Sequence, residues 1–223
     1  MFTVLIFTDG RNDFLERTLT SFTQQVKFPG PVSKILIDDM PQGRDLALLQ
    51  DLAARFAIDR VVLNETNLGV FATVQKGWTL VQNGAPYIFH LENDFVFLDS
   101  IDVGQMVAVL QEPWIVNITL LRQPWYEDER AAGGLMRKEP EKFRAVEVRG
   151  VPVCLHQEYF GHNPGLYRRE FARPVADYTE FNYRDLLIRE DPSRHFAILG
   201  RSGDPPRVLH IGTRRVGKSP DYR

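Results

Sequence analysis

The first hundred residues alternate between short apolar runs and blocks in which apolar residues recur every three or four positions. Four runs, rich in β-branched residues, are typical of strands buried on both faces of a sheet: 3–8, 33–37, 60–63 and 86–91. Three intervening blocks have the spacing of amphipathic helices: 14–22, 46–56 and 70–81. This order predicts an α/β fold with a mostly parallel central sheet and helices on both faces.

Polar groups follow these strands at the ends that meet along one edge of a parallel sheet. Ligands of such sheets bind beyond the carboxyl ends of the strands. One acid at a strand end is usually a turn or capping residue, but acids follow three of the four strands here, which favours a binding site. The candidates are Thr8, Asp9, Arg11, Asp38, Asp39, Asn67, Gly69, Glu92, Asn93 and Asp94.

The second half of the chain is less regular. Its patterns predict a helix over 101–110, a strand over 114–121, one or two strands within 151–167, a helix over 181–188, and short strands at 197–199 and 207–211. The charged segment 122–150 is expected to be a mobile excursion, either a lid or a plain solvated loop. Because no linker or repeat occurs, we expect a single domain over 1–223.

Composition narrows the class of protein. The hydrophobic fraction of 43%, the charged fraction of 25% and the net charge of -2 exclude a disordered chain, a fibrous protein and a uniformly basic nucleic-acid binder. The single cysteine, Cys154, fits a reducing compartment. No apolar run approaches the ~20 residues of a membrane span, and the first residues lack the pattern of a signal peptide. We therefore expect a cytoplasmic protein without a transmembrane segment.

The triplet Glu92-Asn93-Asp94 indicates a metal site. If the backbone stays extended, residues two apart point the same way, so Glu92 and Asp94 present two carboxylates to one cation. Mg²⁺ and Mn²⁺ prefer such oxygen ligands, supplemented by substrate phosphates. The position at the end of a central strand makes this more specific than the spacing alone.

Four segments of the first half resemble a family-2-type glycosyltransferase of the GT-A fold: 4–11, 35–39, 67–77 and 92–94. Beyond residue 100 the likeness thins to 163–169 and 209–212. The resemblance implies a GT-A-like (Rossmann-like) fold in which residues 1–100 bind a nucleotide-diphosphate sugar and a smaller half, 101–223, binds the acceptor. It also implies transfer of a hexosyl or pentosyl group with inversion. Asp38 or Asp39, with Asp9 and Arg11, would hold the nucleoside, and Asn67 and Gly69 would shape the adjoining loop.

The same resemblance points to catalytic and metal residues in the second half. Glu180 and, after it, Asp185 are the candidates for the base that deprotonates the acceptor; the alternative for Glu180 is an acid favoured at a helix start. His210 either completes a Mn²⁺ or Mg²⁺ site or makes a structural hydrogen bond. The chain departs from the family in having Glu92 where the first acid of the metal motif is Asp.

Two other functions remain open. A sugar-phosphate nucleotidyltransferase shares the strand–helix order, although the loop after the first strand has one glycine rather than several. A degenerate, non-catalytic GT-A-like binding module is the second. The sequence 212–219 matches a P-loop letter for letter, but no helix can follow it before Arg223, so we reject a nucleotide hydrolase.

The acceptor is expected to be soluble: a saccharide, a protein or a modified nucleic acid. Residues 194–223 hold six Arg and one Lys against two Asp, a basic end on a slightly acidic chain. Arg214, Arg215 and Lys218 in this segment would neutralise the diphosphate of the donor or an anionic acceptor, or else form a solvated tail.

Overall fold

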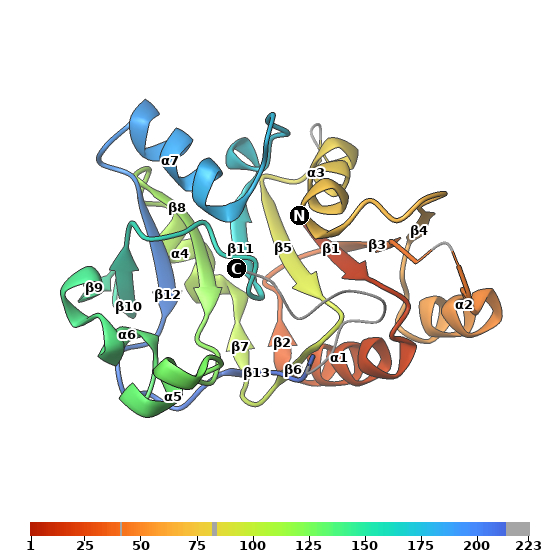
Figure 1. The fold of residues 1–223 in the computed structure, drawn as a ribbon, viewed down its shortest axis with the longest axis horizontal. Coiled ribbons are helices and arrows are strands. Elements are labelled where there is room, and N and C mark those ends of the chain that lie inside the picture. Colours follow the sequence, from red (N-terminus) through yellow and green to blue (C-terminus); the bar gives the residue numbers. More distant parts are fainter. Residues whose placement is uncertain (41, 82–83, 213–223) are drawn as a thin grey trace.

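A central nine-stranded sheet crosses the whole molecule (Figure 1). The computed structural model describes residues 1–40, 42–81 and 84–212. The strand order is β4-β3-β1-β5-β11-β8-β12-β10-β9, so strands from both halves of the chain share one sheet. Arg214, Arg215, Lys218 and most of the P-loop-like sequence lie outside the described residues.

The first half forms the parallel part of the sheet, as predicted. Its strands are β1 (Phe2–Thr8), β3 (Val32–Asp38), β4 (Arg60–Leu63) and β5 (Tyr87–Glu92). The helices between them are α1 (Asn12–Gln25), α2 (Leu46–Arg55) and α3 (Val70–Leu80). β1 pairs in parallel with β3 and β5, with Thr8 opposite Asp38 and Phe7 opposite Glu92. The polar strand ends therefore meet along one edge, as expected.

The second half makes the sheet mixed rather than purely parallel. Its strands are β8 (Ile115–Leu120), β10 (Val151–His156), β11 (Gly165–Arg168) and β12 (His195–Leu199), and its longer helices are α4 (Val103–Leu110) and α7 (Glu180–Glu190). β11 runs antiparallel to both β5 and β8, and β12 is parallel to β8. The carboxyl ends of β8 and β12 therefore lie at the same edge of the sheet as those of β1, β3 and β5.

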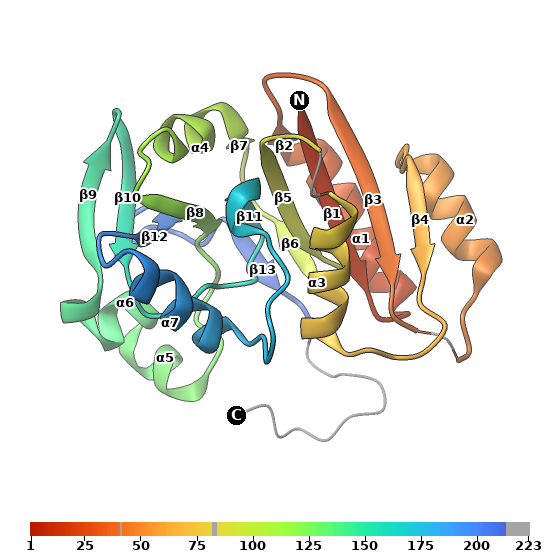
Figure 2. The same cartoon turned by 90° about the horizontal axis from the view of Figure 1, so that it is seen from above.

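Helices cover both faces of this sheet. Residues of β1 alternate between two cores: Val4 and Ile6 pack with α1, α2 and α4, whereas Leu5 and Phe7 pack with α3 and α7. Figure 2 shows α4 on one side of the sheet and α3 and α7 on the other. No helix in the described part of the chain combines the length and the apolar character that crossing a bilayer requires.

The segment 122–150 is not the loop that its charge predicted. It holds α5 (Glu127–Ala132), α6 (Leu135–Lys138), the 3₁₀ turn η1 (Pro140–Lys142) and the edge strand β9 (Arg144–Val148), which pairs antiparallel with β10. This segment is rich in charged residues because an edge strand exposes one face to solvent. A buried ion pair fixes α5: Arg122 Nη1 and Nη2 lie 2.7 and 2.9 Å from the two carboxylate oxygens of Glu129, which is 3% exposed.

Short strands form two small sheets; the strand predicted at 207–211 is one of their members, whereas the pairings themselves had no signal in the sequence. β2 (Val26–Lys27) pairs with β7 (Ile101–Asp102), so the helix expected from residue 101 begins at Val103, with Asp102 as its cap. β6 (Phe95–Phe97) pairs antiparallel with β13 (Val208–His210), which places His210 opposite Phe95. The β6–β13 pairing brings the end of the described chain to the residue after Asp94.

Candidate active site

An open hollow of about 720 Å³ lies where β1, β3 and β5 end and α3 begins. We call it the first hollow. It is lined by Phe7, Thr8, Asp9, Arg11, Asp39, Met40, Asn67, Gly69, Val70, Thr73, Glu92, Asn93 and Asp94. Nine of the ten residues predicted to follow the strands as nucleotide or metal contacts therefore line this hollow, and the exception is Asp38.

Asp39 anchors the loop that precedes α3. Its carboxylate accepts hydrogen bonds from the backbone N–H groups of Leu68 (2.9 Å) and Gly69 (2.8 Å) and from the side-chain amide of Asn64 (2.7 Å). The side-chain amide of Asn67 donates to the carbonyl of Asp39 at 3.0 Å. Gly69 caps α3 with φ at 77°, a conformation that favours glycine. The Asp39 carboxylate thus holds the Asn67–Gly69 loop in the wall of the hollow.

Asp38 points elsewhere. Its side chain is 1% exposed and pairs with the guanidinium of Arg44, which also donates to the carbonyl of Asn64 at 2.8 Å. Burial raises the pKa of the Asp38 carboxyl, and the hydrogen bond from Arg44 opposes that rise. Of the two neighbouring acids, the structure brings Asp39 and not Asp38 to the hollow, because successive residues of an extended chain face opposite sides.

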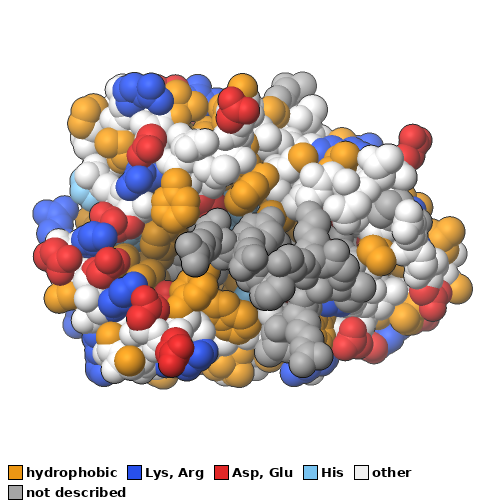
Figure 3. Space-filling model, viewed as in Figure 1, with side chains coloured by type: hydrophobic (Ala, Val, Ile, Leu, Met, Phe, Trp, Pro, Cys, Tyr) orange, Lys and Arg blue, Asp and Glu red, His pale blue; other side chains and the backbone are white. Residues whose placement is uncertain are grey.

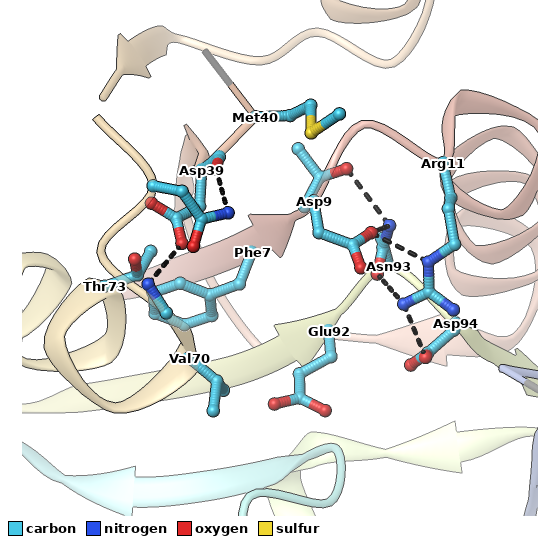
Figure 4. A pocket seen from close by; sticks show the side chains of 13 residues that line it. Phe7, Asp9, Arg11, Asp39, Met40, Val70, Thr73, Glu92, Asn93 and Asp94 are labelled. Atoms are coloured by element: carbon cyan, nitrogen blue, oxygen red, sulfur yellow. Dashed lines mark hydrogen bonds and ion pairs between the residues drawn. The ribbon is translucent and has the colours of Figure 1, made fainter. Parts of the chain in front are cut away.

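Arg11 joins the ends of β1 and β5 (Figure 4). Its guanidinium donates to Asp9 Oδ1 at 2.8 Å and to Asp94 Oδ2 at 2.9 Å, and lies 3.4 Å from Asn93 Oδ1. The Asn93 amide in turn donates to Asp9 Oδ1 at 2.9 Å and to Thr8 Oγ1 at 3.1 Å. Burial disfavours the charge on Arg11, but Asp9 and Asp94 outweigh it and raise the pKa of the guanidinium.

Asp94 and His210 fit a divalent cation as a two-residue site. His210 Nε2 lies 3.2 Å from Asp94 Oδ2, whereas Asp94 Oδ1 is buried without a hydrogen-bond partner among the described residues. Burial opposes ionisation of Asp94, but His210 and Arg11 outweigh it, so the pKa of this carboxyl is lowered. The carboxylate is therefore ionised at neutral pH and keeps one oxygen available as a ligand.

Glu92 is not brought beside Asp94. The strand ends at Glu92, and residues 93–94 form a turn, so the alternation expected for an extended chain stops there. Figure 4 shows the Glu92 carboxylate directed away from the Arg11–Asp94 pair. No group of three or more His, Cys, Asp or Glu side chains in residues 1–40, 42–81 and 84–212 is arranged to hold a metal. Metal ligation by Glu92 stays a prediction, and further ligands would come from a bound molecule.

Glu180 begins α7, as predicted, and the Thr179 hydroxyl caps the helix by accepting from the Asn182 N–H at 3.1 Å. The His162 N–H donates to Glu180 Oε1 at 2.6 Å. Burial raises the pKa of Glu180 to about 7, and the nearby charge of Glu92 adds to the rise. A carboxylate with a pKa near neutrality is suited to accept a proton in a reaction at pH 7.

The structure does not bring Asp185 to the same place. Its side chain is 60% exposed and pairs with Arg184 at 2.6 Å. Asp185 is five residues beyond Glu180 in a regular helix and therefore projects in a different direction. Of the two predicted bases, Glu180 alone lies near Glu92.

Several supporting residues had no signal in the sequence. The Gln123 side chain donates to the His210 carbonyl at 2.8 Å and accepts from its N–H at 2.9 Å, and the Trp125 ring packs 4.0 Å from the imidazole. The Thr18 hydroxyl donates to the Asn93 carbonyl at 2.7 Å and so fixes the turn that carries Asp94. These residues lie far along the chain from those they hold, so local patterns did not reveal them.

Several solved structures share the fold of this chain. The structure is similar to TarS from S. aureus (13% identity, TM-score 0.58), covering 94% of this chain and 36% of that one. It is also similar to the mannosyltransferase PcManGT from Pyrobaculum calidifontis in complex with GDP-Man and Mn²⁺ (10% identity, TM-score 0.62), covering 96% and 58%. A third match is TarS 1–349 from S. aureus in complex with UDP (10% identity, TM-score 0.56), covering 93% and 59%.

These likenesses show the fold, which is that of GT-A glycosyltransferases with a mostly, but not purely, parallel sheet. The chain spans less than two thirds of the length of each of these proteins. No curated protein matches its sequence closely. The sequence model of glycosyl transferase family 2 matches residues 3–170, three quarters of the chain and all the strand ends that line the first hollow. The chain therefore belongs to glycosyl transferase family 2.

Proposed function

We propose that this protein is a metal-dependent glycosyltransferase that moves a hexosyl or pentosyl group from a nucleotide-diphosphate sugar to an acceptor hydroxyl, with inversion. One observation carries the proposal: an acid-lined hollow and the Glu180 carboxylate, whose pKa is about 7, lie at the same edge of the sheet. Family membership and the GT-A fold support the same activity.

The donor would lie in the first hollow. Asp39, Asn67 and Gly69 form the wall that meets the nucleoside, with Thr8 and Asp9 at the end of β1. PcManGT binds GDP-Man and TarS 1–349 binds UDP in the structures compared above, which supports a nucleotide at this edge of the sheet.

The charge of this hollow supports a cation. Four carboxylates line it, those of Asp9, Asp39, Glu92 and Asp94, against the one guanidinium of Arg11. A diphosphate entering such a hollow is repelled unless more positive charge is bound with it. We propose Mn²⁺ or Mg²⁺ held by Asp94 and His210 together with the diphosphate. Such an ion, when bound, stabilises the charge that develops on the departing diphosphate.

Glu180 would act as the base. It takes the proton of the acceptor hydroxyl while the hydroxyl oxygen forms its bond to the anomeric carbon and the bond from that carbon to the diphosphate oxygen breaks. One displacement of this kind inverts the anomeric carbon. His162 orients the carboxylate through its backbone N–H, and its own ring is held by the Tyr178 hydroxyl at 2.5 Å. Burial lowers the pKa of His162 to about 3, so the ring is neutral and does not compete for the proton.

The test begins with binding. We would record thermal shifts with UDP, GDP, ADP and CDP, each with and without Mn²⁺ or Mg²⁺, because a ligand that binds the folded state raises the Tm. We expect one nucleotide to raise the Tm in a metal-dependent way. Asp94→Asn should remove that dependence, whereas Asp99→Asn should not, because Asp99 is exposed outside the hollow and pairs with Arg207. A metal-dependent shift that survives in Asp94→Asn contradicts the metal assignment.

Turnover then separates the transferase from its alternatives. Slow hydrolysis of the matching nucleotide sugar in Mn²⁺ is expected of a transferase without its acceptor. A non-catalytic module would bind the nucleotide sugar and leave it intact. A nucleotidyltransferase would instead consume a nucleoside triphosphate and a sugar phosphate. We also propose that the acceptor is a soluble saccharide, protein or modified nucleic acid and that the protein is cytoplasmic.

A further inference from the structure

A second open hollow, of about 780 Å³, lies at the same edge of the sheet, beyond the ends of β8 and β12. Its walls are the segment around α5 and α6 on one side and the loop between β12 and β13 on the other. We call it the second hollow. It shares no lining residue with the first hollow.

The floor of the second hollow is apolar. Leu121, Leu135, Met136 and Ile198 line it and belong to a small hydrophobic core of their own. Figure 3 shows hydrophobic side chains gathered on the half of the molecule that holds α5, α6 and α7, with charged side chains around them. An apolar floor under a polar rim suits the face of a sugar ring, whose C–H groups pack on carbon while its hydroxyl groups reach the rim.

The charge of the second hollow is opposite to that of the first. Three arginines line it, Arg122, Arg137 and Arg201, against one acid, Asp204. The charge of Arg122 is used within the fold by the bidentate pair with Glu129.

The other two arginines are exposed at the rim. In the described part of the chain, neither the Arg137 nor the Arg201 guanidinium has a hydrogen-bond or ion-pair partner. The acid beside them, Asp204, makes its hydrogen bond within its own loop: its Oδ2 accepts from the backbone N–H of Arg201 at 2.7 Å.

Arg137 bridges the two walls of the second hollow. A Cβ placed on Gly203 would lie 2.9 Å from Arg137 Nη2, and one on Gly133 would lie 3.1 Å from Nη1. Since Gly203 is in the loop after β12 and Gly133 follows α5, the guanidinium reaches across to the loop that carries Arg201. The two positive groups therefore border the same space.

The second hollow lies next to Glu180. Asn163, in its lining, follows His162, whose N–H donates to Glu180. Tyr159, another lining residue, is close enough to Glu180 for electrostatic interaction: burial raises the pKa of the Tyr159 phenol, and the negative charge of Glu180 raises it further. Gln123, also in the lining, holds His210. Glu180 thus stands between the second hollow and the acid-lined first hollow.

We propose that the second hollow binds the acceptor and selects an anionic saccharide, one that carries a phosphate or carboxylate group held by Arg137 and Arg201. Guanidinium groups bind both anions through paired hydrogen bonds. The acid-lined first hollow repels such a group unless a cation accompanies it, so an anionic acceptor without a bound cation is directed to the second hollow rather than the first. This inference rests on the proposed function for calling the ligand an acceptor, but the binding itself can be measured without turnover.

The test is a titration calorimetry series with glucose 6-phosphate, glucuronate and glucose as probes. We expect the protein to bind one or both anionic probes at least tenfold more tightly than glucose; which of the two binds better identifies phosphate or carboxylate as the recognised group. Arg137→Gln with Arg201→Gln should lower that affinity at least tenfold and leave glucose unchanged. Arg60→Gln is the matched control, because it removes an exposed arginine on β4, at the other end of the sheet.

Competition distinguishes this inference from the proposed function. Saturating UDP or GDP with Mn²⁺ should leave the affinity for the anionic probe unchanged, and the double variant should bind the nucleotide as the parent does. Displacement of the probe by the nucleotide, or equal affinity for anionic and neutral probes, overturns the inference while leaving the donor site intact. If no nucleotide binds but the arginine-dependent affinity for the anionic probe is found, the second hollow stands and the proposed function fails.

Discussion

Replacing the Glu180 carboxylate should strongly slow transfer and, at the same time, stabilise the fold at alkaline pH. Glu180→Gln keeps the shape of the side chain and retains an oxygen to accept the His162 N–H. It removes the proton acceptor, so transfer should fall by about 10²–10⁴-fold while donor binding persists. In the parent protein, kcat/KM should rise with pH through a midpoint near the pKa of about 7.

The effect on stability follows from the same pKa. The folded protein holds the Glu180 proton up to pH about 7, whereas the ordinary value is 4.5, so the folded state binds the proton more tightly than the unfolded state. Stability is therefore present below pH 4.5 and is lost as the pH rises to 7. At 1.36 kcal/mol per tenfold change in proton affinity the full loss is ~3 kcal/mol.

Solvent reduces that figure, because the Glu180 side chain is 31% exposed. We expect Glu180→Gln to gain about 1–2 kcal/mol at pH 8 and little at pH 5, which is roughly 2–8 °C in Tm for a chain of this size. The assay is thermal unfolding followed by circular dichroism at both pH values. Asp185→Asn is the control, since Asp185 is exposed and paired with Arg184. A gain in Tm that is equal at pH 5 and pH 8, or transfer that survives in Glu180→Gln, refutes the reasoning.

Three further predictions concern single side chains. Asp39→Asn should raise the Kd for the nucleotide whether or not metal is present, and it should lower the free energy of unfolding by about 1–3 kcal/mol, because the loop N–H groups lose a charged acceptor. Calorimetry measures the Kd and urea unfolding measures the stability. An unchanged Kd would contradict a nucleotide site at Asp39. Gly212→Ala should weaken metal-dependent nucleotide binding, since its Cβ would stand 2.1 Å from Asp94 Oδ2; an unchanged thermal shift with nucleotide and Mn²⁺ contradicts this. Glu129→Gln should lower the free energy of unfolding by about 3–5 kcal/mol, because it leaves the buried Arg122 charge unpaired, and the nucleotide Kd should not change. A Tm within about 1–2 °C of the parent would show that the pair is dispensable.

Local patterns determined the first half of the fold. β-branched runs buried on both faces and amphipathic spacing are recorded in neighbouring residues, so β1, β3, β4 and β5 and the helices between them follow from the sequence. Parallel strands with helical crossovers must end along one edge, and that rule predicts that Asp9, the pair Asp38 and Asp39, and Asp94 lie close together. The pattern that predicts a helix over 181–188 also placed Glu180 at the start of α7.

Sequence patterns gave wrong or incomplete predictions where the burial of a residue depends on contacts with residues far along the chain. The segment 122–150 was expected to be a loop because its charges hide the edge strand β9 and the buried Glu129–Arg122 pair. Neighbouring acids looked equivalent in sequence, yet Asp38 pairs with Arg44 and Asp39 holds the loop before α3. Which of two adjacent carboxylates faces a cavity depends on the direction of the chain as the strand ends, and the sequence does not specify that direction.

The sequence by itself therefore determined the α/β class, the edge of the sheet at which ligands bind and the helix that presents Glu180. Only the tertiary structure decided which side chains the site residues contact. Pairing of β6 with β13 joins His210 to Asp94 across more than a hundred residues, and the end of β5 at Glu92 turns that side chain away from the pair. The physical reason is that secondary structure follows from the periodicity of nearby side chains, whereas a binding site follows from contacts between segments, whose free energy no local pattern records.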